Sequence, residues 1–485
     1  MSAMIPYQEL SPVEFQENLA RKGSSGQYEL FHYTVLKESP GAWSILAVIG
    51  EPKQGTCEWL KTIIPGGGRI DSLAAVWPAL LWPEREIHDQ TDGIIENHPD
   101  LRPLLYPERV ELRGVAHGSG TFHLPLGPVR SDVTESLLFL FDILGEQIMF
   151  LESQLFYKHR QVEVLGRGKK PGYGVLLAER VAGTSTVAHA VAFTRAIEQA
   201  LGRPATIRQE QERVLLGEME RLYNHAGDLA QLAGATGMTV GQAQFARIKE
   251  ELLRLNADLC GSRYLRSTVR IHGDSGVNWT QQGGSLLTKL QDIARRFEQF
   301  TSLLKMTPTF VDRLKGTGII KKEWARAFDL VGPVARGNRI GRDVRLNYRH
   351  KGSEWGNWSI AVNRQGTGDA FSRFGVRVEE WTQSLHLIQF LLSLLEEPEW
   401  GRESGAGTPC PSPTGWGHGL AESPRGRTSH IVNIDREGNI AFWNIRSASG
   451  SNWPVFGLAT ANENIQTDFP IIEASFALSV ASCDR

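Results

Sequence analysis

Apolar residues at helical spacing run through the middle of the chain. Between residues 215 and 229 they step by three and four, which places them on one face of a helix. The same spacing recurs in residues 245–259, 286–304 and 378–392. A further helix is expected from residue 187 to the Gly-Arg-Pro break at 202–204, with Ser185 or Thr186 as its cap. These five amphipathic segments predict a helical bundle with a shared core.

Shorter patterns outside these segments are typical of strands. Residues 43–50 and 137–144 are apolar runs of strand length, and a second apolar stretch extends to residue 64. Residues 122–148 alternate around Gly127-Pro128, and residues 428–446 alternate around a turn at 435–438, which predicts a hairpin. We expect a short helix at 73–81 and polar, Gly-rich connections at 336–368 and 401–427, the second of them a long surface loop.

Together these patterns predict an α+β protein. We expect residues 1–112 to form a small α+β domain and residues 113–122 to form a linker. Residues 123–485 are then expected to form a mainly helical bundle with peripheral β-hairpins.

Composition narrows the class of protein. The chain has 485 residues and a formal net charge of -2, so it lacks the basic excess of a nucleic-acid-binding protein. Its 4 cysteines, at 57, 260, 410 and 483, form no C-x-x-C pair, which predicts neither a zinc site nor an iron–sulfur cluster nor a disulfide framework. No signal peptide is expected at the start, and no apolar run reaches the roughly 18 residues of a membrane helix.

Two segments, 178–189 and 468–485, carry small residues three positions apart. Ala182 and Ser185 lie in the first, and Ser479 and Ser482 in the second. This spacing suits a pair of metal ligands at each end of the chain, yet none of the four residues is a cysteine.

The motifs around these segments resemble those of a known family. Residues 123–485 resemble the large subunit of membrane-bound, energy-converting nickel–iron hydrogenases of the formate hydrogenlyase and hydrogenase-4 type, which is related to the 49-kDa-like, quinone-site subunit of complex I. The family motif R-G-x-E is present as Arg-Gln-Val-Glu at 160–163, C-G-I-C as Ala-Gly-Thr-Ser at 182–185, and A-P-R-G as Ser-Pro-Arg-Gly at 423–426. Asn-Trp-Pro is kept at 452–454, and the terminal D-P-C-x-x-C-x-D-R motif corresponds to residues 477–485.

The first part of the chain resembles the 30-kDa-like subunit of complex I, which these hydrogenases carry as an N-terminal fusion. The matching segments are Glu-Arg-Glu-Ile-His-Asp at 84–89 and His-Pro-Asp-Leu-Arg-Pro-Leu-Leu at 98–105. The resemblance implies that the second segment docks against a neighbouring iron–sulfur subunit.

In the family, four thiolates hold nickel, and two of them also bridge to iron. Thiolates are soft anionic ligands, whereas alanine has no donor atom and a serine hydroxyl is hard and neutral. All four positions are lost here, as Ala182, Ser185, Ser479 and Ser482, and Cys483 is one residue out of register. The resemblance therefore implies that this chain binds no metal and is not an active nickel–iron hydrogenase.

The resemblance also implies which residues belong to the site, and some of them can equally have a purely structural role. Glu163 is expected as a buried proton relay beside the emptied site, or as a helix-face ion pair with Arg160. Arg425 is expected either over the site or as an ordinary loop arginine. His159, Arg160 and Arg130 are expected to line a polar cavity. Arg130 and Gly183 occupy the two positions at which the complex I subunit binds the quinone head group.

Expectations can also be stated for four further residues. Glu135 and Tyr157 are candidates for the same cavity, for which a quinone is a candidate ligand. His189 is expected as a core histidine rather than a ligand. Asp343 is expected in a surface ion cluster with Arg342 and Arg345; the resemblance implies as the alternative a position close to the site arginine.

Three functions follow from the resemblance. The first is a subunit of a membrane-associated, complex I- and hydrogenase-4-related oxidoreductase complex that has lost its nickel–iron site and couples electron transfer to proton or cation translocation. The second is a subunit of an NADH-dehydrogenase-like complex that reduces quinone or another acceptor, which requires an enclosed polar cavity around the four former ligand positions. The third is a non-catalytic scaffold, which would be favoured if apolar side chains filled the space around the four former ligand positions.

The implied setting is a peripheral one, on the cytoplasmic face of a bacterial inner membrane. The expected partners are a small iron–sulfur subunit, which holds the clusters, and membrane subunits resembling cation/proton antiporters and the complex I membrane anchor. No nucleic acid is expected.

Overall fold

The computed structural model describes residues 7–91, 93–110, 118, 120–130, 135–348, 366–395, 414–461 and 463–485. Most of the predicted linker at 113–122 lies outside the described residues, as do 349–365 and 401–413 of the two predicted connections. Within the described ranges no helix is both long and apolar enough to cross a membrane.

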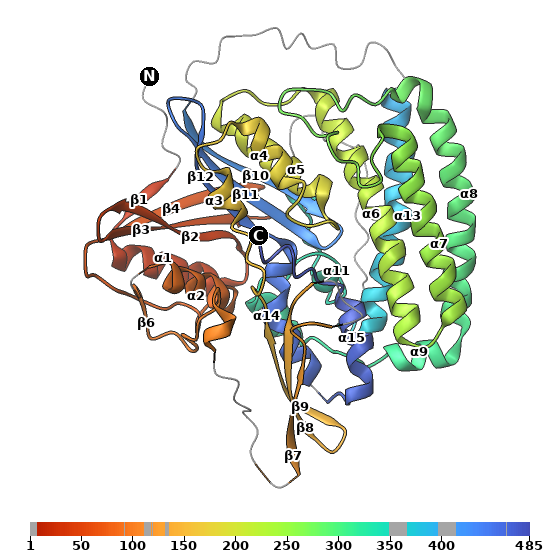
Figure 1. Cartoon of the computed structure of the whole chain (residues 1–485), viewed down its shortest axis with the longest axis horizontal. Helices are drawn as coiled ribbons and strands as arrows, with labels where there is room; N and C mark the ends of the chain where they lie inside the picture. Colours follow the sequence, from red (N-terminus) through yellow and green to blue (C-terminus); the bar gives the residue numbers. More distant parts are fainter. Residues whose placement is uncertain are drawn as a thin grey trace.

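The N-terminal region is a small sheet covered by two helices. Strands β2 (Glu29–Ser39), β3 (Ala42–Glu51) and β4 (Thr56–Ile64) are antiparallel, and β1 (Gln8–Leu10) pairs in parallel with β4. Helices α1 (Pro12–Ser25) and α2 (Leu81–Gln90) lie against this sheet (Figure 1). The predicted strands are confirmed, whereas the predicted helix at 73–81 is wrong. A proline disfavours helical backbone in the residue before it, and Trp77, which precedes Pro78, is not helical.

The two segments that resemble the 30-kDa-like subunit are tied together. The Arg85 side chain on α2 donates to the carbonyls of Arg102, at 2.9 Å, and Pro103, at 3.1 Å. The Asp89 carboxylate accepts the backbone N–H groups of Leu104, at 2.6 Å, and Leu105, at 2.8 Å. The extended segment that follows α2 is therefore ordered by side-chain contacts with that helix.

A three-stranded antiparallel sheet follows, which confirms the strands predicted in residues 122–148. It consists of β7 (Thr121–Leu126), β8 (Leu138–Leu144) and β9 (Gln147–Gln154), and it projects at the bottom of Figure 1. Strand β9 packs on helix α14 (Ala448–Ala461).

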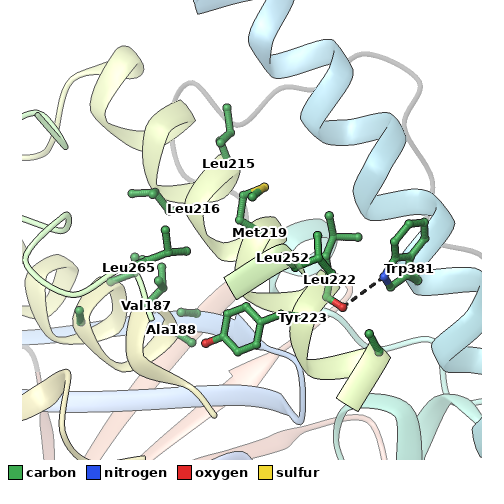
Figure 2. Close-up of a cluster of buried hydrophobic side chains, with 14 of the residues drawn as sticks. Val187, Ala188, Leu215, Leu216, Met219, Leu222, Tyr223, Leu252, Leu265 and Trp381 are labelled. Atoms are coloured by element: carbon green, nitrogen blue, oxygen red, sulfur yellow. Dashed lines mark hydrogen bonds between the residues drawn. The ribbon is translucent and has the colours of Figure 1, made fainter. Parts of the chain in front are cut away.

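The five predicted helices are all present. They are α5 (Thr186–Ala200), α6 (Ile207–Ala235), α7 (Thr239–Cys260), α8 (Trp279–Met306) and α13 (Ala370–Leu395). The last four stand side by side as a bundle (Figure 1). Figure 2 shows apolar side chains of α6 turned inward between their neighbours, where the Trp381 indole N–H of α13 donates to the Leu222 carbonyl at 3.1 Å.

A second three-stranded sheet packs on α5. It contains β10 (Gly415–Ser423), β11 (Gly426–Ile434) and β12 (Ile440–Arg446), so the predicted hairpin is confirmed. The prediction of a surface loop at 401–427 is wrong for its described part, because β10 is a buried strand. Its glycines allow close packing: a Cβ on Gly417 or Gly419 would lie 1.9 Å from the carbonyl oxygen of Ala196 or Ala192.

The remaining elements are short and connect these layers. Figure 1 places the C-terminus near the centre of the molecule, between the sheet of β10–β12 and the helices around α14. The short elements are β5 (Ile70–Asp71), β6 (Ile95–Glu96), α3 (Val162–Gly166), α4 (Pro171–Ala178), α9 (Pro308–Leu314), α10 (Lys322–Ala327), α11 (Gly332–Arg336), α12 (Val344–Asn347) and α15 (Phe469–Phe476).

Candidate functional site

The structure brings together the two segments that carry the former ligand positions. Arg160, just before α3, donates from its guanidinium to the carbonyls of Arg180 at 2.8 Å and Val181 at 2.6 Å. The same guanidinium donates to the carbonyl of Ala481 at 2.5 Å. The two segments are nearly 300 residues apart in the chain, and Arg160 links the residues that precede Ala182 and Ser482.

At the C-terminal positions, the serine hydroxyls are used locally. The Ser482 hydroxyl donates to the Ser479 carbonyl at 3.1 Å, and the Ser482 N–H donates to the Ser479 hydroxyl at 3.2 Å. The Glu135 carboxylate accepts the Val480 N–H at 2.6 Å. These contacts are those of a hydrogen-bonded turn, in which neither hydroxyl is presented as a ligand.

At the N-terminal positions, the start of α5 is stabilised by a residue that the sequence did not single out. Ala182 is buried, and Ser185 occupies the N-cap position without making a cap hydrogen bond through its side chain. The Glu220 carboxylate of α6 instead accepts the N–H groups of Val187 at 2.7 Å and Ala188 at 3.1 Å. Ser185 is therefore the N-cap residue, as predicted, but the hydrogen bonds to the first N–H groups of the helix come from a carboxylate of another helix instead of its hydroxyl.

Burial raises the pKa of Glu220 to about 8, although its two backbone hydrogen bonds act in the opposite direction. This carboxyl group therefore titrates close to neutral pH, beside one of the two former ligand segments.

The donor set does not fit a nickel–iron centre. None of the four positions carries a thiolate, and no group of three or more His, Cys, Asp or Glu within the described ranges could hold a metal ion. Burial raises the pKa of the nearby Cys483 thiol to about 12, so it is neutral at physiological pH.

Glu163 forms an ion pair, but its partner is not Arg160. Its carboxylate accepts from Arg485 Nε at 2.6 Å and from the Ile445 N–H at 3.2 Å. Arg485 also pairs with Glu86 of α2, which connects the C-terminal residue to the N-terminal region. Glu163 is buried, as expected for a relay, and its role in proton transfer stays a prediction.

The residues expected to line one polar cavity are engaged separately. Arg130 donates to Glu473 of α15 at 2.9 and 3.1 Å, Glu135 binds Val480, and the Tyr157 hydroxyl donates to Gln154 at 3.2 Å. His159 packs its ring edge against Phe156, and its Nδ1 is buried without a hydrogen-bond partner in the described part of the chain.

Burial and the neighbouring Arg485 lower the pKa of His159, so its imidazole is neutral at pH 7. A cavity of about 50 Å³ lies nearby and is lined in part by Phe156, Cys483 and Arg485, but none of the four former ligand residues lines it. The quinone stays a prediction.

Arg425 lies in the tight turn between β10 and β11 and is buried. Its guanidinium makes a two-pronged contact with Asp228 of α6, at 2.6 and 2.7 Å, and Arg377 of α13 donates to the same carboxylate at 3.1 Å. Burial alone would raise the pKa of Asp228, but Arg425, His225 and Arg377 hold it well below its usual range. Arg425 is thus part of a charged cluster in the protein interior rather than an exposed loop arginine.

This cluster continues through the interior. The expectation that Asp343 belongs to a surface ion cluster is wrong: the side chain is buried and accepts from Arg336 at 3.0 Å and from Arg345 at 2.7 Å. Arg336 also pairs with Glu380 at 2.6 Å and with Glu422 at 3.0 Å.

The sequence contained a signal for these buried ions. Glu218, Arg221, His225 and Asp228 step by three, four and three along α6, parallel to the apolar stripe, so they form a second stripe on the same helix. Such a stripe is more often solvated, because charged side chains are seldom buried without partners. The long-range partners here come from α12, α13 and the β10–β11 turn, far away in sequence.

His189, on α5, fits the expectation of a core histidine. Its Nδ1 lies 2.9 Å from Nε2 of His430, whose Nδ1 accepts from the Trp443 indole N–H at 3.1 Å. Burial, with Arg160 and Arg485 nearby, lowers the pKa of His189 to about 3, which keeps its ring neutral.

Two parts of this chain match known families. Residues 49–121 match the 30 Kd subunit of respiratory-chain NADH dehydrogenase, and residues 235–413 match its 49 Kd subunit. The chain is 27% identical to hydrogenase-4 component G of Escherichia coli (strain K12), over 95% of this chain and 81% of that protein. It is 26% identical to formate hydrogenlyase subunit 5 of the same strain, over 92% and 82% of the two chains. It is 24% identical to the carbon monoxide-induced hydrogenase of Rhodospirillum rubrum, over 75% and 99%.

The fold matches that of a chain in a solved respiratory complex. A chain of the membrane-bound sulfane sulfur reductase, described as an archaeal respiratory membrane complex, superimposes with a TM-score of 0.66 at 21% identity. The match covers 76% of this chain and 99% of that chain. This match confirms the predicted α+β fold class, and the sequence matches confirm the predicted resemblance to subunits of complex I, hydrogenase-4 and formate hydrogenlyase.

Proposed function

We propose that the chain is a peripheral subunit of a membrane-associated oxidoreductase complex, in which it couples electron transfer to the movement of protons or cations without a nickel–iron site. Its relatives include hydrogenase-4 component G, formate hydrogenlyase subunit 5 and subunits D of NADH-quinone oxidoreductase. In our proposal a small iron–sulfur subunit supplies the clusters, and membrane subunits resembling antiporters and the complex I anchor carry the ions. The chain binds the cytoplasmic face of a bacterial inner membrane through these partners.

The observation that carries the proposal is the local structure at the former ligand positions. Alanine or serine stands in place of a thiolate at each of the four positions, and Arg160 donates hydrogen bonds to both segments. Ser479 and Ser482 are hydrogen-bonded to each other, and Glu135 accepts hydrogen bonds from Ser479 and Val480. The interior also keeps titratable groups that can exchange protons, among them Glu220, whose pKa burial raises to about 8. A frame that is retained without its metal supports a changed role in the complex.

The proposal is tested on the complex purified from its native host through a tag on this chain. Metal analysis is expected to find iron from partner clusters and no stoichiometric nickel, and a hydrogen-uptake assay is expected to find no activity. Mass spectrometry of the purified material identifies the partner subunits. Stoichiometric nickel, or a chain that purifies without any redox partner, would contradict the proposal.

A further inference from the structure

Helices α3 and α4 present an apolar surface to solvent. On α3, Val164 is 52% exposed and Leu165 53%, and on α4, Tyr173 is 48% exposed and Leu176 43%. Single exposed apolar residues are ordinary on protein surfaces, whereas a group within one short segment marks a binding surface.

Both helices are held with this face outward. A Cβ on Gly166 of α3 would lie 2.5 Å from the Trp443 ring, and one on Gly174 of α4 would lie 2.4 Å from the Phe193 ring. The Trp443 and Phe193 rings are themselves in contact, with centroids 4.6 Å apart. The two helices therefore pack their glycine sides on the same aromatic pair, and their opposite sides form one outer surface.

The charge around this surface is almost entirely positive. The only acidic residues between positions 158 and 180 are Glu163 and Glu179; both are buried, Glu163 pairs with Arg485, and Glu179 accepts the Ser267 N–H. An exposed acid, Glu437, lies at one edge, where Lys170 donates to its carbonyl. The exposed cations of this stretch are Lys158, Arg160, Arg167, Lys169, Lys170 and Arg180.

We propose that this α3–α4 patch, made of the four apolar residues and the six cations, docks an acidic face of a partner subunit. The apolar part consists of only four side chains on two short helices, each about half buried already, whereas a membrane-anchoring helix buries a continuous apolar face ~5–10 Å deep. An apolar centre with a charged rim is the usual layout of a protein–protein interface. Because the rim is cationic, the complementary partner surface carries Asp and Glu.

The position of the patch ties it to the former ligand segments. Arg160 and Arg180 belong to its rim, and Arg160 donates to the carbonyls of Arg180, Val181 and Ala481. A partner seated on the patch thus covers the site where the two ends of the motif meet. This inference rests on the proposed function in that it assumes a complex, and it adds the surface and the chemistry of one contact.

The test compares the tagged complex from the native host with the isolated chain. Both are treated with an acetylating reagent, and the labelling rates of Lys158, Lys169 and Lys170 are measured by mass spectrometry. We expect at least tenfold slower labelling of these lysines in the complex. A carbodiimide, which joins amines to carboxylates without a spacer, is expected to link Lys169 to an Asp or Glu of one partner subunit.

Two substitutions test the patch, and each has a matched control. Leu165→Asp and Lys169→Glu are each expected to lower the amount of that partner retained on the tagged chain by roughly tenfold. Leu303→Asp, at a leucine on α8 that is 52% exposed, and Lys322→Glu, at an exposed lysine on α10, are expected to retain it. Circular dichroism of each isolated variant checks that it is folded.

The possible outcomes separate the two proposals. Equal labelling of the three lysines in the complex and in the isolated chain overturns the docking surface and leaves the proposed function intact. Protection that is reproduced by vesicles of anionic phospholipid alone, without a carboxylate cross-link, assigns the patch to the membrane surface and also overturns it. Purification of the chain without any redox partner overturns both proposals.

Discussion

Arg160 allows a quantitative prediction, because a single guanidinium joins the two ends of the former metal motif. It makes three hydrogen bonds to main-chain carbonyls, two in the segment before Ala182 and one in the segment before Ser482. A hydrogen bond to a charged group contributes about 1.5–3 kcal/mol. Since Arg160 is partly exposed and water can replace it, we expect Arg160→Ala to weaken local attachment of the C-terminal segment by about 2–4 kcal/mol in total.

The loss should be visible as faster hydrogen exchange in residues 480–484. The amides of Cys483 and Asp484 donate to the Val480 carbonyl, and the Val480 amide donates to Glu135. If these amides exchange through local opening, the expected weakening corresponds to about 30- to 900-fold faster exchange. Arg160→Lys should lie between the wild type and Arg160→Ala, because an ammonium cannot reproduce the planar fork of donors.

The control for this experiment is Arg167→Ala. Arg167 is an exposed arginine directly after α3, the helix that follows Arg160, and it contacts the Phe442 ring at 5.8 Å. Its removal should leave exchange in residues 480–484 unchanged. Unchanged exchange in Arg160→Ala as well would refute the reasoning, because it would mean that the C-terminal segment is held by its other contacts alone.

Three further predictions concern buried positions. Arg425→Met, which leaves Asp228 with weaker compensation, should lower the free energy of unfolding by about 3–5 kcal/mol in denaturant titrations. Glu220 has a folded-state pKa of about 8 against 4.5 in the unfolded chain, so its contribution to stability is present below pH 4.5 and is lost as the pH rises to 8, by at most about 5 kcal/mol. Glu220→Gln should therefore flatten the fall in stability measured between pH 5 and 8. Gly419→Ala, whose methyl would collide with the Ala192 carbonyl at 1.9 Å, should lower the melting temperature by several degrees.

Each of these predictions has a comparison that can contradict it. For the Arg425–Asp228 salt bridge the comparison is Arg167→Met. An equal loss of stability in Arg425→Met and Arg167→Met would exclude a special role for the buried pair. For Glu220, parallel pH profiles of wild type and variant would show that this carboxyl does not titrate in the stated range. For β10 the comparison is Gly172→Ala, at a glycine of α4 with open space around it, which should be tolerated.

Local patterns predicted the five long helices α5, α6, α7, α8 and α13 and most strands correctly, but not the helix expected at 73–81. The apolar stripe of α6 and the alternation of β11 and β12 depend on neighbours a few positions away, and such neighbours are fixed by the chain itself. Strand β10 was missed because its glycines suggest a loop. They are required by the close approach of α5, which no local pattern reveals.

The sequence by itself also determined that the four motif positions lack thiolates, because the donor atoms of a side chain do not depend on the fold. Only the tertiary structure decided how the remaining groups are used. It paired Arg425 with Asp228, placed Glu220 at the start of α5, buried Asp343 and set Arg160 across both motif segments. The physical reason is that a buried charge needs a partner at hydrogen-bonding distance, and that partner can be remote in the chain, as Arg425 and Asp228 are, 197 positions apart.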